Sequence, residues 1–152
     1  MKKSLKKTLA SIMAVASLLV GVPSINANAD TTVSHENGIS IAPCTTNYWG
    51  YSTTRSKSNN TKAYLHVSSG PCSPAVKILG GNSQDTHGNM NCTLNSSGNS
   101  VSYLVVSVGG VLYINNNVRN NYNFATLAFQ SSSSYIGGYI NIDWSADTNG
   151  NN

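Results

Sequence analysis

The stretch that decides the fold lies near the end of the chain, where residues 135–144 read Tyr-Ile-Gly-Gly-Tyr-Ile-Asn-Ile-Asp-Trp. In an extended strand, successive side chains point to opposite faces. One face then carries only large apolar groups, and the other carries tyrosines and small or polar groups. The first set is Ile136, Ile140, Ile142 and Trp144, and the second is Tyr135, Gly137, Tyr139 and Asn141. This pattern predicts a strand over Tyr135–Asp143 with its isoleucine face in a core.

Shorter alternating runs recur through the chain, separated by Gly, Asn, Ser and Pro. No stretch after residue 29 has apolar residues at helical spacing between capping residues. Strands with one apolar face each suit two packed antiparallel sheets, so we expect an all-β fold, a single antiparallel β-sandwich-like domain. The other expected strands are Gly38–Ala42, Tyr48–Thr54, Lys62–Val67, Ala75–Leu79, Asn89–Leu94, Val101–Val108, Val111–Ile114 and Tyr122–Phe129.

Two adjacent glycines give the clearest turn signal. Gly109 and Gly110 separate the runs Val101–Val108 and Val111–Ile114. Both glycines can take the positive φ angles of a primed turn. We therefore expect these two runs to pair as a β-hairpin.

The first 29 residues have the pattern of a secretory signal peptide. Four lysines fall within the first seven residues, and an apolar run extends over Leu9–Val22. Ala27 and Ala29 are the small residues that signal peptidase requires, so we expect cleavage after Ala29. Because the apolar run is shorter than the roughly 20 residues that cross a bilayer, we expect residues 30–152 to be a secreted β-rich domain without a transmembrane segment.

Most of the positive charge lies in this leader. Of the nine Lys and Arg, four precede residue 8, whereas all five Asp and Glu follow residue 29. The remaining chain is formally neutral, which argues against a nucleic-acid partner. About half of it is Asn, Ser, Thr or Gly, and the Asn-rich segment 115–123 predicts a solvated loop.

Three cysteines follow the leader: Cys44, Cys72 and Cys92. In an oxidising compartment they allow one disulfide in any of three pairings, or none. Cys72 lies in a turn and Cys92 in a later strand, and a bridge between them closes a loop of about twenty residues, which stabilises a protein by roughly 3 kcal/mol. Cys72 and Cys92 are therefore the disulfide candidates, with Cys44 as the free thiol.

Aromatic residues are the candidates for ligand binding. Tyr48, Trp49 and Tyr51 fall in one short stretch, and Trp144 follows the last strand. Flat rings stack on sugars or on apolar partners. The alternative is that Trp49 and Trp144 are core or edge-covering residues, which is the commoner use of a large ring.

Residues for catalysis and metal binding are sparse. Glycoside hydrolysis needs two carboxylates facing one bond, but two of the five acids lie near the ends of the neutral part of the chain. No Gly-x-Ser-x-Gly motif is present, and no protease signature surrounds a cysteine. Asp85 and His87 form the one pair at ligand spacing, without a second pair to complete a site. We expect no catalytic residue, no metal site, no cofactor and no enzymatic activity.

Several short motifs carry a family resemblance over about Gly38–Asn149. They are Tyr51-Ser-Thr-Thr-Arg55 with Asn59, Asn60 and Lys62, then Ser68-Ser69-Gly70, Asn121-Tyr122, Gly138-Tyr139 and Asp143-Trp144. In these motifs the chain resembles a family of small secreted proteins of Gram-positive bacteria that is classed as a domain of unknown function. The resemblance implies a secreted β-domain and carries over no functional residues. Some small secreted proteins of that general kind look like bacteriocins.

These observations together favour a secreted, non-enzymatic interaction protein. It would act on an extracellular or cell-surface partner, at or outside the cell envelope, with a bacteriocin-like role as a special case. One alternative is a carbohydrate-binding module that uses the aromatic candidates. The other alternative is an extracellular hydrolase.

Overall fold

The computed structural model describes residues 31–148, so the expected signal peptide and its cleavage site lie outside the described residues. Within this range the chain forms eleven strands and one four-residue helix. No helix within residues 31–148 is long and apolar enough to cross a bilayer. The predicted all-β fold is confirmed.

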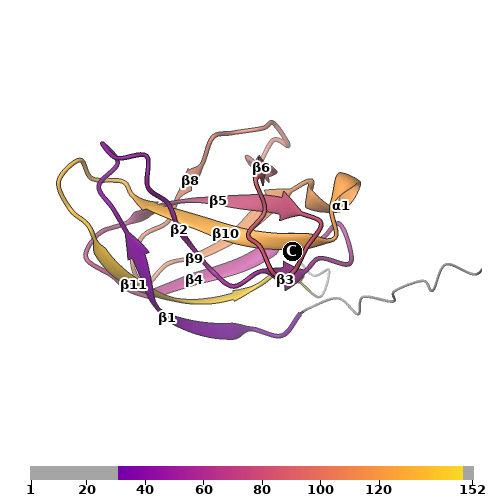
Figure 1. The fold of residues 1–152 in the computed structure, drawn as a ribbon, viewed down its shortest axis with the longest axis horizontal. Helices are drawn as coiled ribbons and strands as arrows, with labels where there is room; N and C mark the ends of the chain where they lie inside the picture. The colour runs from indigo at the N-terminus through magenta and orange to yellow at the C-terminus, as the bar shows by residue number, and fades with distance from the viewer. Residues whose placement is uncertain (1–30, 149–152) are drawn as a thin grey trace, which may run out of the picture.

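The strands form two antiparallel sheets packed face to face (Figure 1). Sheet A contains, in spatial order, β1 (Ser34–Ile41), β11 (Gly138–Ser145), β4 (Ala63–Ser69), β9 (Val111–Asn116) and β7 (Thr93–Leu94). Sheet B contains β2 (Gly50–Tyr51), β10 (Phe124–Ser131), β5 (Pro74–Gly81) and β6 (Met90–Asn91), with β3 (Arg55–Ser56) also beside β10 and β8 (Leu104–Val105) beside β5. The helix α1 (Val118–Asn121) links β9 to β10.

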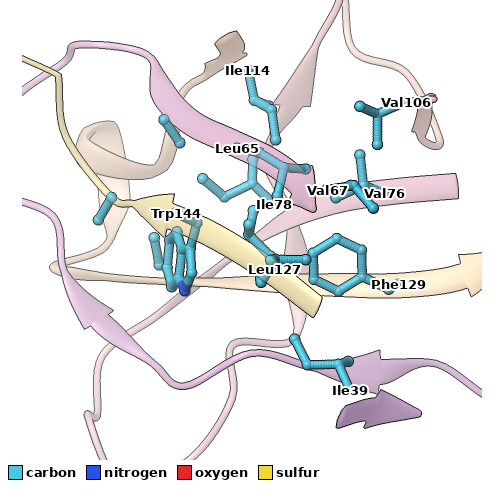
Figure 2. Packing of buried hydrophobic residues seen from close by; sticks show 14 of the residues in the cluster. Ile39, Leu65, Val67, Val76, Ile78, Val106, Ile114, Leu127, Phe129 and Trp144 are labelled. Atoms are coloured by element: carbon cyan, nitrogen blue, oxygen red, sulfur yellow. The ribbon is translucent and has the colours of Figure 1, made fainter. Parts of the chain in front are cut away.

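The core lies between the two sheets (Figure 2). Three residues of the predicted isoleucine face are fully buried in β11, and large side chains of β4, β5 and β10 complete the cluster. These residues are Ile140, Ile142, Trp144, Leu65, Ile78, Leu127 and Phe129. Full burial of such a side chain stabilises the fold by about 1.5 to 3 kcal/mol. Ile136 differs from the prediction, because it precedes β11 and is 42% exposed.

The predicted hairpin over Val101–Ile114 is wrong, because the two runs belong to different sheets. β8 pairs with β5, whereas β9 pairs with β4 and β7. The turn comprises Ser107–Gly110, and its third residue, Gly109, has a positive φ of 78°. A positive φ at the third residue and none at the second residue, Val108, is the pattern of a type II turn rather than a primed one. A type II turn splays the strands that it joins. The Gly110 N–H donates to the Ser107 carbonyl at 2.9 Å, and the Gly109 N–H donates to the Val67 carbonyl of β4 at 2.7 Å.

The predicted strand Asn89–Leu94 is divided at Cys92. β6 pairs with β5 in sheet B, and β7 pairs with β9 in sheet A. The Cys92 N–H donates to the Ile78 carbonyl at 2.9 Å, and the Cys92 carbonyl accepts from the Asn117 N–H at 3.2 Å. The chain therefore changes sheets at this residue.

The predicted disulfide between Cys72 and Cys92 is absent, since all three cysteines are free thiols. Cys72 precedes Pro74, the first residue of β5, whereas Cys92 lies opposite Ile78. The strand residues between them span about 13 Å. A disulfide requires Cα atoms within about 7 Å of each other.

Candidate functional site

A row of side chains crosses the outer face of sheet B. Phe129 of β10 is buried in the core, so its neighbour Ala128 faces outward. Ala128 pairs with Tyr51 of β2 on one side and with Lys77 of β5 on the other. The small alanine side chain leaves the space above the middle of the row to larger groups from both sides.

Trp49 and Lys77 form a cation–π contact beside this row. The Nζ atom of Lys77 lies 3.9 Å from the centroid of the Trp49 ring. Partial burial lowers the pKa of Lys77 from its ordinary value. Contacts of this kind contribute about 1 kcal/mol, so the ammonium group favours this orientation of the indole.

Tyr51 stacks on His87 at the next position along the face. The two ring centroids are 3.9 Å apart, and the ring planes differ by 3°. His87 belongs to the loop 82–89 between β5 and β6. This loop is fixed to the sheet because the Gly88 N–H donates to Oγ1 of Thr126, an outward residue of β10, at 3.3 Å.

The loop 42–49 crosses the same face at its other end. Gln130 lies two residues beyond Ala128 on β10 and therefore points outward as well. Its Nε2 donates to the carbonyl oxygens of Thr46 at 2.6 Å and Tyr48 at 3.2 Å. The amide thereby holds Tyr48, a residue that is 51% exposed, at the rim of the face.

A pocket lies at each end of this face. The first has a volume of ≈ 350 Å³ and is lined by Gly81, Asn82, Ser83, Thr86, His87, Gly88, Asn89 and Tyr122. The second has a volume of ≈ 430 Å³ and is lined by Cys44, Ala75, Tyr103, Val105, Gln130, Ser131 and Ser132. β5 and β10 run between the pockets, and each has eight residues, which span about 26 Å.

We call this surface the aromatic strip. It consists of the two pockets together with Tyr48, Trp49, Tyr51, Lys77 and His87, the last of which lines the first pocket. Three of the four ligand-binding candidates predicted from the sequence thus lie together. Lys77 and His87 were not predicted as members, because only the pairing of β10 with β2 and β5 brings them to Trp49 and Tyr51.

Trp144 is the fourth candidate, and it lies elsewhere. Its side chain is fully buried in the core, and its Nε1–H donates to Oε1 of Glu36 at 2.6 Å. The guanidinium of Arg55 lies 5.6 Å from the ring centroid. Trp144 is therefore a core residue, which was the alternative interpretation of this tryptophan in the sequence.

A cluster that the sequence analysis did not identify lies on the outer face of sheet A. Asp143 of β11 pairs with His35 of β1 and with His66 of β4. Nδ1 of His35 contacts Oδ1 of Asp143, and Nδ1 of His66 lies 3.0 Å from Oδ2. The hydrogen bond from His35, followed by that from His66, lowers the pKa of Asp143 below its ordinary value. The alternation of side chains along each strand places all three residues on the outer face of sheet A. Only the register between the strands brings them together.

Asp85 and His87 are the one pair at metal-ligand spacing in the sequence. His87 instead stacks on Tyr51 in the aromatic strip. Within residues 31–148, no group of three or more His, Cys, Asp or Glu residues is arranged to hold a metal ion.

The fold and the strip define a small two-sheet β-sandwich with an aromatic, amide-lined outer face. The chain belongs to the family described as protein of unknown function (DUF2712), whose sequence model matches residues 22–148. The predicted membership of a family of unknown function is thereby confirmed. No curated protein and no solved structure matches the chain.

Proposed function

We propose that this protein is a secreted, non-enzymatic interaction protein that binds a partner at or outside the cell envelope through the aromatic strip. The observation that carries the proposal is the display of Trp49 and Tyr51 on one face, each ordered by a neighbouring side chain. An ordered ring loses little conformational freedom on binding, so more of its contact energy remains as affinity.

The chemistry of the strip favours a glycan as the partner. Aromatic rings offer flat apolar surfaces for stacking. The pocket beside His87 adds the amides and hydroxyls of Asn82, Ser83 and Asn89, which orient a polar ligand by hydrogen bonds. Because the strip is long and has a pocket at each end, it suits a chain of several sugar units. A carbohydrate-binding module is therefore the more specific form of the proposal.

Co-sedimentation with isolated bacterial cell envelopes tests the proposal. Trp49→Ala and Tyr51→Ala should each weaken binding at least tenfold, as expected for aromatic residues at the centre of an interface. Tyr139→Ala is the matched control, because Tyr139 is 70% exposed on sheet A, away from the strip. Equal binding by the wild-type protein and the three variants would refute the role of the strip, and so would an equal loss of binding in all three variants.

A glycan array separates the forms of the proposal. Binding to purified glycans that vanishes in Trp49→Ala identifies a carbohydrate-binding module. Envelope binding that disappears after protease treatment of the envelopes identifies a protein partner. Killing of indicator strains by the purified protein would identify the bacteriocin-like form, and turnover of peptide, ester or glycan substrates would replace the proposal with a hydrolase.

A further inference from the structure

We propose that Lys57 and Asp147 are joined by an intramolecular amide bond between their side chains. The pair lies apart from the aromatic strip, and the proposal does not depend on what the strip binds. Lys57 follows β3 of sheet B, and Asp147 follows β11 of sheet A, 90 positions later. Both side chains have no exposed surface. The bond would therefore tie the two sheets together at one end of the sandwich.

The amine nitrogen lies beside the carboxyl group. Nζ of Lys57 is 2.6 Å from Oδ1 of Asp147. It also donates to the carbonyl oxygens of Thr61 at 2.5 Å and Ala146 at 2.8 Å, which fix its position. Since Cγ of Asp147 is bonded to Oδ1, the nitrogen is held next to the carbon that it would attack. Such positioning greatly raises the effective concentration of a nucleophile.

Burial favours the uncharged amine that the reaction needs. Removal from water disfavours the ammonium form of Lys57. Burial is the largest effect on Lys57 and lowers its pKa, although Asp147 opposes this. Transfer of one proton from Nζ to Oδ1 along the hydrogen bond converts the ion pair into an amine and a carboxylic acid. The amine then has the lone pair of a nucleophile.

The carboxyl group is polarised from its other side. Oδ2 of Asp147 accepts hydrogen bonds from the Ser58 N–H at 2.9 Å and from the Ser58 hydroxyl at 3.2 Å. Two donors at this oxygen stabilise the negative charge that develops there when a nucleophile adds to Cγ. The Thr61 hydroxyl donates to Oδ1, the departing oxygen, at 3.3 Å.

The step is a condensation that needs no oxidant and no cofactor. Nζ forms a bond to Cγ, and the bond between Cγ and Oδ1 breaks. Oδ1 leaves as water with two of the three ammonium protons, and the third proton stays on the amide nitrogen. In the product, the single amide N–H keeps one of the two carbonyl acceptors, that of Thr61 or that of Ala146, and Oδ2 retains both donors of Ser58.

The test is the intact mass of the purified protein, measured after denaturation, with its N-terminus determined by sequencing. The wild-type protein should be lighter than its sequence by one water molecule, and trypsin should release one branched peptide that contains Lys57 and Asp147. Lys57→Arg, which keeps the positive charge but lacks the amine, should have the full mass. Lys77→Arg is the matched control and should keep the water loss.

Two results would overturn the proposal. The first is a folded wild-type protein with the full sequence mass, which decides the matter even if the variants do not fold. The second is a water loss that persists in Lys57→Arg, because the lost water would then come from another site, such as ring closure at an aspartate.

Discussion

Substitutions at two glycines should separate backbone strain from steric clash. Gly109 has a φ of +78°, and no atom lies within 4 Å of the position that a Cβ would take. Gly109→Ala should therefore cost only the left-handed backbone energy of an L-residue, about 1 to 2 kcal/mol. At Gly50, a Cβ would lie 1.8 Å from the Ser40 carbonyl oxygen, which is a backbone atom. Gly50→Ala should therefore cost about 3 kcal/mol or more, at the upper end of overpacking or beyond it.

Urea unfolding followed by tryptophan fluorescence measures these costs. With an m-value of roughly 1.5 kcal/mol/M, a loss of about 1.5 kcal/mol lowers the midpoint by about 1 M. Gly109→Asn should recover most of this loss, because asparagine tolerates the left-handed region. An unchanged midpoint for Gly109→Ala would refute the turn geometry, and so would an asparagine variant as unstable as the alanine variant.

Three further predictions concern acid stability, loop anchoring and thiol reactivity. Because the folded pKa of Asp143 is lowered, its carboxylate stabilises the fold above the unfolded pKa of about 3.9, and this stability is lost as the pH falls through the folded value. Asp143→Asn should therefore flatten the decline of the urea midpoint at acid pH, and an unchanged decline would contradict this. Gln130→Ala removes two hydrogen bonds to the loop 42–49, so it should lower the free energy of unfolding by about 1 to 3 kcal/mol and shift the fluorescence emission of Trp49 to the red. Unchanged stability and emission would refute the role of Gln130 in anchoring this loop. Burial raises the pKa of Cys92, so a thiol reagent should modify the exposed Cys44 first and Cys92 only on unfolding. Fewer than three reactive thiols per chain in denaturant would contradict the prediction that all three cysteines are free.

Alternation along the chain predicts which side chains enter the core, because a strand turns every second residue to the same face. It does not predict where a strand begins. β11 was expected from Tyr135 and begins at Gly138, since the first paired residues are Gly138 and Ile41. The start of the strand is set by its neighbour β1, which lies far away in the sequence.

The candidate site could be predicted only where its residues are close in sequence. Trp49 and Tyr51 are two positions apart, so their cluster was visible in the sequence. His35 and Asp143 are 108 positions apart, and His66 and Asp143 are 77 positions apart. Contacts at such separations depend on the order of strands in a sheet, which local patterns do not determine.

The order of the strands also explains the wrong hairpin. Gly109 was correctly assigned a left-handed conformation, but the sequence does not show that Gly110 lacks one. The strands on either side pair elsewhere, β8 with β5 and β9 with β4 and β7, so the turn between them does not have to be a primed one.

The close approach of Gly50 to Ser40 obstructs one end of an edge strand where another molecule could pair. β1 is the edge strand of sheet A, and an uncovered edge is a template for pairing with another molecule. At the end of β1 the β2 backbone lies beside the Ser40 carbonyl, and beyond Ile41 the Ala42 carbonyl already accepts from the Ser131 N–H at 3.0 Å, so an incoming strand cannot pair along this end. On the opposite side of the sandwich, the edge strands β6 and β7 have only two residues each. Strands this short offer a growing fibril too few backbone hydrogen bonds to hold an added chain.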